Sequence, residues 1–486
     1  MQRFENLNKS FINGEWVEGK SQRNYEITDP YDNSIITTVR LANVDQVREA
    51  FEAAEKAQKE WAKTTPGQKR EVLFNAKAFL ESNRDEIVQL LIREAGGTVL
   101  KSSFELMLAL SDLDEALKMV DKTYTPKDYP SVTPGKVNRV YKLPVGVITS
   151  IAPFNFPTHV GTRTIFPAIA LGNSVVHKPD IQTGITGGSI IAKALEEAGL
   201  PKGVFNSILT DIEETGDAIL TNPQSSLISF TGSTAVGRHI GKIAGGMLKK
   251  VALELGGNNP MLVLSDADVD HAVDIAVFGK FLHSGQICAI TNRIIVHKNL
   301  YQDFITKFVD RVKGLTCGDP KNPNTIIGPV INSRQADKIM GFVDDAKKAG
   351  YKMVVEGERN GNVISPFVFA DVPNNAPLAC TELFGPIATI IPCESDEEAM
   401  RFANDTEYGL SSAIVTGDIE KGERLALDIE AGATHVNDAT ANEESNVPFG
   451  GVKQSGIGRF GYEWVIEEFT TSKWVSIQAE KREYPI

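Results

Sequence analysis

The sequence predicts an α/β protein with two parallel-sheet domains. From residue 145, short apolar runs alternate with helical stretches, and a second alternating series follows Gly257. Such alternation is typical of βαβ units, in which a helix joins two parallel strands. The chain has 486 residues, which is too long for one hydrophobic core, so we expect two or three domains.

Composition is typical of a globular protein without metal or nucleic-acid partners. Hydrophobic residues make up 42% of the chain, and no apolar run reaches the length of about 18 residues that a membrane span needs. The net charge of −13 disfavours nucleic acids and anionic membranes. Residues 1–6 lack the apolar core of a signal peptide. The four cysteines form no CxxC pair and the histidines show no metal spacing, so we expect no disulfide framework, no metal and a reducing cytoplasm.

The first 120 residues are predicted to be mostly helical after a short hairpin. The hairpin covers residues 11–17, where an Asn-Gly turn interrupts an apolar run. Asn43 is placed to cap a helix with Gln46 at its third position, and apolar residues follow at helical spacing. Thr65 and Pro66 begin the next helix, because proline at the first helical position loses no hydrogen bond.

The two alternating series then supply the sheets. In the first, strands are expected at 145–151, 174–177, 204–208 and 227–230, and helices at 186–198, ended by Gly199, and at 234–248. In the second, helices are expected at 266–283 and 302–313, and strands at 294–297, 352–355, 387–391, 412–415 and 434–437.

Residues 253–258 would connect the two series, and a cleft between α/β domains is a common ligand site. Two further strands, at 138–142 and 470–478, have no obvious local partner. We expect them to pair with something remote, such as another subunit.

A thiol and a carboxylate are the strongest candidates for chemistry. Cys288 stands 34 positions after Glu254, and each lies in its own glycine-marked segment. A thiolate attacks carbonyl carbon well, and a nearby carboxylate can move protons. Taken separately, Cys288 reads more simply as a buried apolar cysteine, and Glu254 as the partner of a lysine. His283 is too isolated to support a cysteine–histidine protease.

Three other motifs lie where strands are predicted to end. The 230–237 segment (FTGSTAVG) opens a helix and would let a dinucleotide phosphate approach its N-terminus, although a plain strand–turn–helix is the better explanation of the motif taken alone. Lys178 ends another strand, where α/β sheets bind ligands, but a solvated surface lysine is the alternative. Asn155 lies among apolar residues and suits an oxyanion hole or, alternatively, a proline turn.

Together these segments resemble the aldehyde dehydrogenase superfamily over nearly the whole chain. The motifs that carry the resemblance, in order, are 153–157 (PFNFP), 230–233 (FTGS), 253–257 (LELGG), 285–288 (GQIC), 382–386 (ELFGP) and 448–451 (PFGG). The resemblance implies a Rossmann-like dinucleotide-binding domain, an α/β catalytic domain and a small β element for oligomerisation. We assign residues 1–121 and 145–255 to the first, 256–453 to the second, and 122–144 with 470–486 to the third.

The resemblance also assigns roles to individual residues. Cys288 is similar to the family's nucleophile, Glu254 to its general base, and Asn155 to its oxyanion-hole donor, together with the Cys288 backbone N–H. The implied cofactor contacts are Ile151, Pro153, Lys178, Asp180, Phe230, Gly232, Ser233, Gly237, Leu255, Gly256, Glu382 and Phe384. The expected activity is oxidation of an aldehyde to the acid with NAD(P)+, through a thiohemiacetal and a thioester, in a homodimer or homotetramer.

One departure from the family pattern concerns the choice of cofactor. Most NAD-preferring members carry a glutamate three residues after the lysine that matches Lys178, and this chain has Ile181 there. A carboxylate at that position would repel the 2′-phosphate of NADP+, and this chain has none there. Asp180, one residue earlier, could partly replace it. We therefore expect NAD(P)+, with NAD+ favoured slightly.

Finer similarity predicts an aromatic substrate. The stretches 158–163, 178–183 and 281–286 look most like the benzaldehyde and vanillin dehydrogenase branch. The predicted substrate contacts are Phe154, His159, Val160, Arg163, Ile287 and Ala289, with Arg163 either meeting a ring hydroxyl or forming a structural salt bridge. Three other readings are a CoA-acylating dehydrogenase on the same fold, a non-catalytic scaffold protein and a cysteine hydrolase. The joint presence of Cys288, Glu254 and Asn155 argues against the scaffold, and Glu254 argues against CoA acylation.

Overall fold

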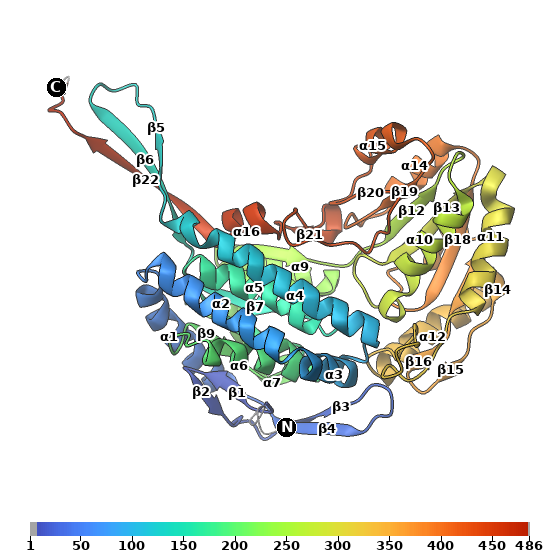
Figure 1. Ribbon diagram of the computed structural model, residues 1–486, viewed down its shortest axis with the longest axis horizontal. Helices are drawn as coiled ribbons and strands as arrows, with labels where there is room; N and C mark the ends of the chain where they lie inside the picture. Colours follow the sequence, from blue (N-terminus) through green and yellow to red (C-terminus); the bar gives the residue numbers. More distant parts are fainter. Residues whose placement is uncertain (1–6, 485–486) are drawn as a thin grey trace.

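The computed structural model describes residues 7–484 and contains two large sheets with helices packed around them (Figure 1). The α/β prediction is therefore confirmed. Residues 1–6, on which the expectation of no signal peptide rests, lie outside the described residues, as do residues 485–486.

The first large sheet has the strand order β2-β1-β9-β8-β7-β10-β11-β21. Its five central strands run parallel, whereas the β1–β2 hairpin and β21 pair antiparallel at the edges. The strands are β1 Ser10–Ile12, β2 Glu15–Val17, β7 Val147–Ile151, β8 Ser174–Lys178, β9 Phe205–Ser207, β10 Ser225–Thr231, β11 Lys250–Glu254 and β21 Gly456–Ile457. The predicted hairpin and the strands of the first series are confirmed.

Helices bury both faces of this sheet. Val175 and Val176 of β8 belong to different hydrophobic clusters, because successive strand side chains point to opposite faces. The helices around the sheet are α1 Val44–Trp61, α2 Pro66–Ser82, α3 Arg84–Ala95, α4 Val99–Met119, α5 Pro157–Ala170, α6 Ile190–Glu197 and α9 Thr234–Gly246. Capping boxes start α1 at Asn43 and α2 at Thr65, as predicted for Asn43.

The helix predicted at 186–198 differs in its first turn. Residues Ile185–Ser189 form a π-helical turn (η4), and α6 proper begins only at Ile190. The buried carboxylate of Glu94 accepts the backbone N–H groups of Ile185 at 2.8 Å and Thr186 at 2.7 Å. This non-local anchor holds the widened turn in place, and no local pattern reveals it.

The second large sheet has the strand order β14-β17-β18-β13-β12-β19-β20, parallel except for β14. The strands are β12 Asn259–Val263, β13 Thr291–His297, β14 Lys352–Val355, β17 Phe367–Ala370, β18 Ile387–Cys393, β19 Ala413–Val415 and β20 His435–Val436. Around them lie α10 Val269–Phe281, α11 Lys298–Lys313, α12 Ser333–Lys348, α14 Asp396–Asn404 and α15 Ile419–Ala426. The predicted second series is confirmed in order and type. However, α10 ends at 281 instead of 283, because His283 and Ser284 take positive φ angles of 50° and 56°.

The two orphan strands of the sequence pair with each other. β22 (Thr470–Gln478) lies antiparallel to β6 (Lys136–Pro144), and β5 (Lys127–Tyr129) pairs on the other edge of β6. Their partner is therefore remote in sequence but within the chain. This three-stranded arm projects from the body, as Figure 1 shows, and Trp474 on it is 64% exposed.

The chain crosses between the large sheets once in each direction near Glu254. β11 ends at Glu254 and β12 begins at Asn259, so residues 255–258 form the first crossing. Later, β21 returns to the first sheet and pairs Gly456 with Glu254. The remaining elements are η2 Val120–Thr123, β3 Asn24–Thr28, β4 Ile35–Arg40, η3 Ile181–Thr183, α7 Ile212–Thr215, α8 Ala218–Thr221, η5 Leu282–Gly285, β15 Arg359–Asn360, β16 Val363–Ile364, α13 Pro377–Cys380, η6 Lys453–Ser455 and α16 Tyr462–Phe469.

Candidate active site

A cavity of about 230 Å³ lies where the two sheets meet, and most of the predicted site residues line it. Those that line it are Pro153, Phe154, Asn155, His159, Val160, Arg163, Gly232, Ser233, Glu254, Leu255, Gly256, Ile287, Cys288, Ala289, Glu382 and Phe384. Ile151, Lys178, Asp180, Phe230 and Gly237 lie outside it. The sequence therefore located the cavity from segments that are far apart along the chain.

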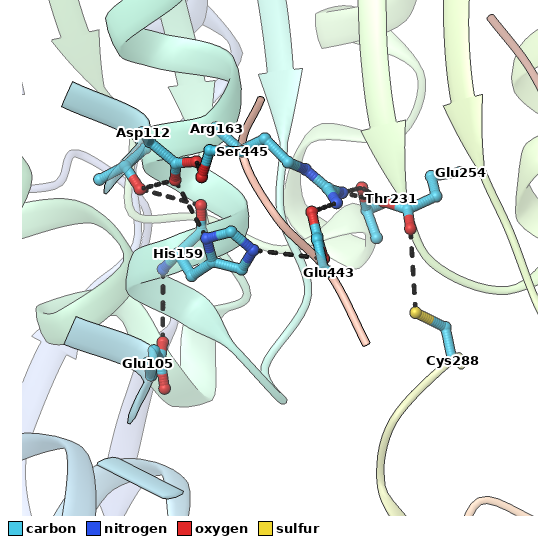
Figure 2. Close-up of polar contacts among 10 residues, drawn as sticks. Glu105, Asp112, His159, Arg163, Thr231, Glu254, Cys288, Glu443 and Ser445 are labelled. Atoms are coloured by element: carbon cyan, nitrogen blue, oxygen red, sulfur yellow. Dashed lines mark hydrogen bonds and ion pairs between the residues drawn. The ribbon is translucent and has the colours of Figure 1, made fainter. Parts of the chain in front are cut away.

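Cys288 and Glu254 face each other across this cavity. The Cys288 Sγ lies 3.9 Å from Glu254 Oε1 (Figure 2). Glu254 ends β11, and its backbone is fixed on both sides by pairing with Thr231 and Gly456. The turn before the cysteine passes so close to another segment that a Cβ on Gly285, whose φ is +79°, would lie 2.3 Å from the Gly385 carbonyl oxygen. Only glycine fits there without moving the loop that carries the thiol.

The Cys288 thiol is uncharged at neutral pH in this environment. Burial is the main cause, Glu443 adds to it and Arg163 opposes it, and together they raise the pKa of the thiol to about 12. A thiol attacks carbonyl carbon only as the thiolate, so it must lose its proton on the way to reaction. Glu254 Oε1 is a carboxylate oxygen within reach of that proton.

Asn155 is held beside the cysteine loop. Its side-chain Nδ2 donates to the Gln286 backbone carbonyl at 2.9 Å, and the side chain is buried. A carboxamide nitrogen carries two N–H groups, so one remains to face a ligand in the cavity. That arrangement has the chemistry of an oxyanion hole.

A row of alternating charges runs from Glu254 away from the thiol, as Figure 2 shows. Arg163 pairs through Nη2 with Glu254 Oε2 and through Nη1 with Glu443 Oε1, the latter at 2.5 Å. Glu443 lies 3.3 Å from His159 Nε2, and His159 Nδ1 lies 3.0 Å from Asp112 Oδ2. The salt bridge considered for Arg163 from the sequence is therefore present.

The row is electrostatically self-consistent although it is buried. Burial would lower the pKa of His159, but Asp112 and Glu443 outweigh it and raise that pKa to about 10. Burial would likewise raise the pKa of Glu443, but Arg163 and His159 hold it below its ordinary value. His159 is thus an imidazolium at neutral pH.

A second buried pair fixes the start of α5, which carries His159 and Arg163. Glu105 accepts the Thr158 backbone N–H at 2.8 Å, and Lys101 pairs with Glu105 at 2.5 Å. A carboxylate is favourable at this position, because the free N–H groups and dipole of a helix N-terminus attract negative charge. Both α5 side chains are thereby presented to the cavity from one fixed helix end.

Away from the charged row, the cavity wall offers a carboxylate that can accept hydrogen bonds from ribose hydroxyls and two aromatic rings that can pack against a flat ring. Glu382 Oε1 accepts the Gly257 N–H at 3.1 Å, and burial raises the pKa of Glu382 to about 7. A Cβ on Gly256 would lie 2.5 Å from Glu382 Oε2, so a larger residue there would displace the Glu382 carboxylate. The rings of Phe154 and Phe384 meet edge to face with centroids 6.0 Å apart.

The remaining predicted cofactor contacts lie outside this cavity, near the ends of β7, β8 and β10 and on α9 beside Ser233. Lys178 Nζ donates to the Pro179 carbonyl at 3.2 Å, and Asp180 Oδ1 accepts the Gln182 N–H at 3.0 Å, which caps η3. Ser233 caps α9, and a Cβ on Gly237 would lie 2.3 Å from Leu255. Phe230 packs against Gly232 in the turn before α9. Ile151 lies in the parallel pair of β7 with β8, opposite Lys178.

Sequence reasoning missed several residues of the cavity. Glu443 and Thr231 are charged or polar, and the apolar lining adds Phe104, Leu108 and Phe449. Glu443 stands in an acidic, irregular stretch, where no periodicity marks it as buried. Only the helical spacing that aims Phe104 and Leu108 the same way on α4 could have suggested a shared face.

Comparison with known proteins identifies the family of the chain. The model of the aldehyde dehydrogenase family matches residues 16–475. The chain belongs to the aldehyde dehydrogenase family. It is similar to a benzaldehyde dehydrogenase of Bacillus subtilis, at 45% identity over 100% of both chains, and to a vanillin dehydrogenase of Corynebacterium glutamicum, at 43% identity over 97% of both. A crystal structure of a salicylaldehyde dehydrogenase from Pseudomonas putida G7, complexed with salicylaldehyde, has a TM-score of 0.95 at 34% identity, covering 98% of this chain and 99% of that one.

This aldehyde dehydrogenase shows two further features across residues 7–484. No helix there combines the length and the apolar composition that crossing a bilayer requires. Nor do three or more histidine, cysteine, aspartate or glutamate side chains in that range gather closely enough to hold a metal ion.

We predict a pH-dependent stability contribution from His159. Its folded pKa of about 10 lies above the unfolded value of about 6.5, so its stabilisation is complete below pH 6.5 and is lost as the pH rises through 10. The difference in Tm between the unmodified enzyme and His159→Gln should therefore shrink between pH 6 and pH 10. Thermal unfolding at pH 6, 8 and 10 measures it, with the exposed His271→Gln as control. A difference that stays constant would show that folding does not raise the pKa of His159.

Proposed function

We propose that the enzyme oxidises aromatic aldehydes to carboxylic acids with NAD(P)+, through a thiohemiacetal and a thioester on Cys288. The observation that carries the proposal is the convergence of Cys288, Glu254 and Asn155 on one cavity. The substrate side of that cavity is apolar and aromatic, with Phe104, Phe156 and Phe449 in its wall. Benzaldehyde, vanillin and salicylaldehyde dehydrogenases among the relatives support the same substrate class.

The residues divide the reaction between them. Glu254 Oε1 takes the thiol proton, and the Cys288 sulfur forms a bond to the aldehyde carbon. The second Asn155 N–H and the Cys288 backbone N–H hold the resulting oxyanion. NAD(P)+, when bound, supplies the acceptor for the hydride that leaves that carbon. Glu254 releases the thiol proton to solvent and then takes a proton from water; the hydroxide attacks the thioester, and the carbon–sulfur bond breaks to give the acid and the thiolate.

The residues on the cofactor side fit a nicotinamide nucleotide. Glu382 can accept hydrogen bonds from ribose hydroxyls, and the glycine at 256 leaves room beside it. The α9 N-terminus at Ser233 suits a phosphate. Asp180 already caps η3, so it supports only weak discrimination against a 2′-phosphate. We therefore keep both cofactors, with NAD+ favoured slightly.

We propose that the enzyme works as a homodimer or homotetramer in the cytoplasm. The arm of β5, β6 and β22 exposes Trp474, Tyr129 and Ile477, and such an apolar sheet surface suits a second copy. The described cysteines are free thiols, which suits a reducing compartment.

The division into domains at residues 121, 145, 255 and 453 also remains a prediction.

Two variants test the assigned chemical roles. Cys288→Ala should abolish the pre-steady-state burst of NAD(P)H, because no thiohemiacetal can form. Glu254→Gln should form its burst more slowly, because the thiol has lost its base, and should lose at least about 100-fold in steady-state turnover, the usual contribution of a general base. Stopped-flow absorbance at 340 nm measures both. Hydride transfer that survives in Cys288→Ala would refute the covalent route.

An aldehyde panel tests the substrate class. We expect kcat/KM for benzaldehyde and hydroxylated benzaldehydes to exceed that for straight-chain aldehydes of similar size by about tenfold or more, the discrimination that a shaped apolar pocket provides. Each aldehyde is measured with NAD+ and with NADP+. Straight-chain aldehydes that outperform benzaldehyde tenfold would contradict the aromatic assignment and leave the family reaction intact.

The proposed role of Glu382 predicts a pH effect on cofactor binding. The raised pKa of about 7 means that the carboxylate form, the better acceptor for ribose hydroxyls, increases as the pH rises from 6 to 8. The Kd for NAD+ should fall over that range in the unmodified enzyme and change little in Glu382→Gln. Titration of tryptophan fluorescence measures it. A pH-independent Kd in the unmodified enzyme would remove Glu382 from the cofactor site.

A further inference from the structure

A buried carboxylate and a partly exposed one share a single guanidinium at the cavity, and the roles assigned above do not use that arrangement. Arg163 binds Glu254 on one side and Glu443 on the other. Its guanidinium carbon lies 4.5 Å from the centre of the Phe460 ring and 5.3 Å from that of Phe449. Aromatic faces attract a guanidinium, so both its position and its plane are fixed.

Glu443 is itself held in place from the far side. His159 lies 3.3 Å from its Oε2, and Asp112 holds His159. Asp112 in turn accepts hydrogen bonds from Thr162 at 2.8 Å and Ser445 at 2.9 Å. The guanidinium is therefore anchored through a chain of fixed contacts, and its hold on Glu254 does not depend on a mobile side chain.

The consequence falls on the two oxygens of Glu254. Oε2 is occupied by Arg163 and by the Thr231 hydroxyl at 3.2 Å. Oε1 is the oxygen left to face the Cys288 sulfur. A carboxylate without the guanidinium could rotate and exchange its oxygens, whereas this one presents the same oxygen throughout.

We propose that Arg163 and Glu443 are positioning residues for the catalytic pair. Arg163 holds Glu254 with Oε1 turned to Cys288, and Glu443 holds Arg163 in place while limiting its attraction. The assignment rests on the proposed function, since it gives these residues a part in the thiol and water steps. Both act through Glu254 and Cys288 and need no contact with the substrate.

The charges make the two residues act in opposite directions. A cation beside a carboxylate or thiol favours the charged form, and an anion disfavours it. Besides burial, Glu443 raises the pKa of the Cys288 thiol and Arg163 lowers it. Glu254 is faced by Arg163, which lies on α5, and by Cys288, which lies on the cysteine loop. The other charged groups that line the same cavity are Glu443, Glu382 and Lys338. If the salt bridge were purely structural, removing Arg163 and removing Glu443 would not change the reactivity of Cys288 and Glu254 in opposite directions.

The first test follows hydrolysis of the acyl-enzyme by rapid quench from pH 5 to pH 9. In Arg163→Gln the acidic limb of the profile should move to higher pH by about one unit, because Glu254 has lost its neighbouring cation. In Glu443→Gln it should move to lower pH. Arg163→Lys, which keeps the charge, should lie nearer the unmodified enzyme than Arg163→Gln does. Arg311→Gln, which removes an exposed cation on α11, is the matched control.

The second test needs no turnover. In a Glu254→Gln background, where the base cannot compensate, the rate of Cys288 alkylation by iodoacetamide reports the thiolate fraction. Adding Arg163→Gln should slow alkylation at pH 8 about threefold or more, and adding Glu443→Gln should accelerate it by a similar factor, as expected for shifts of about half a pKa unit. Circular dichroism confirms that each variant is folded.

The outcomes separate the two proposals. Opposite shifts in the two variants support the positioning role, and shifts in the same direction, or none, overturn it. If Arg163→Gln does not fold, Glu443→Gln alone decides, because an unchanged profile and alkylation rate contradict the assignment. An enzyme that produces no NAD(P)H from any aldehyde refutes the proposed function, while the alkylation rates still test the charge arrangement.

Discussion

The site depends on the fixed backbone of Glu254 at the edge between the two sheets. β10 and β21 pair with this residue from opposite sides, so its carbonyl and amide are held on both flanks. The four residues that follow carry the chain into the second sheet. Glu254 ends β11, and residues 255–258 connect that strand to β12 in the second sheet. A shift of either sheet would therefore move the Glu254 carboxylate relative to the Cys288 thiol. The backbone at Glu254 therefore fixes the position of one sheet relative to the other at the cavity.

A row of charges in the wall of an apolar cavity carries a large desolvation free energy. Each charge taken from water costs several kcal/mol unless partners replace its hydration. Here the signs alternate from Asp112 through His159, Glu443 and Arg163 to Glu254, so every member has an opposite neighbour. Apolar residues of the same volume would pack at lower cost. Retention of the row is therefore better explained by what it does to Glu254 and Cys288 than by stability.

Local patterns predicted local structure well, and the site only in part. The capping box at Asn43 involves residues three apart, and the alternating series depends on periodicity, so both were visible in the sequence. The resemblance supplied the residues of the cavity but not their ionic partners. Glu443 reaches Arg163 across 280 positions, and Glu94 fixes the π-helical turn from 91 positions away. Such contacts arise from packing, for which a single sequence carries no periodic signal. The same reason left β6 and β22 without a predicted partner.

The geometry at Glu254 also constrains how one carboxylate serves two steps. Because Arg163 holds Oε2, the proposed reaction sends both the proton from the thiol and the later proton from water to Oε1. The first proton must therefore leave Oε1 before water can be activated. The apolar wall on the substrate side offers no charged acceptor for it, and Glu443 is a poor one, because Arg163 and His159 hold the pKa of Glu443 below its ordinary value. In the proposed reaction, the aromatic end of the cavity shields the substrate, and the proton leaves Oε1 through the polar part of the lining.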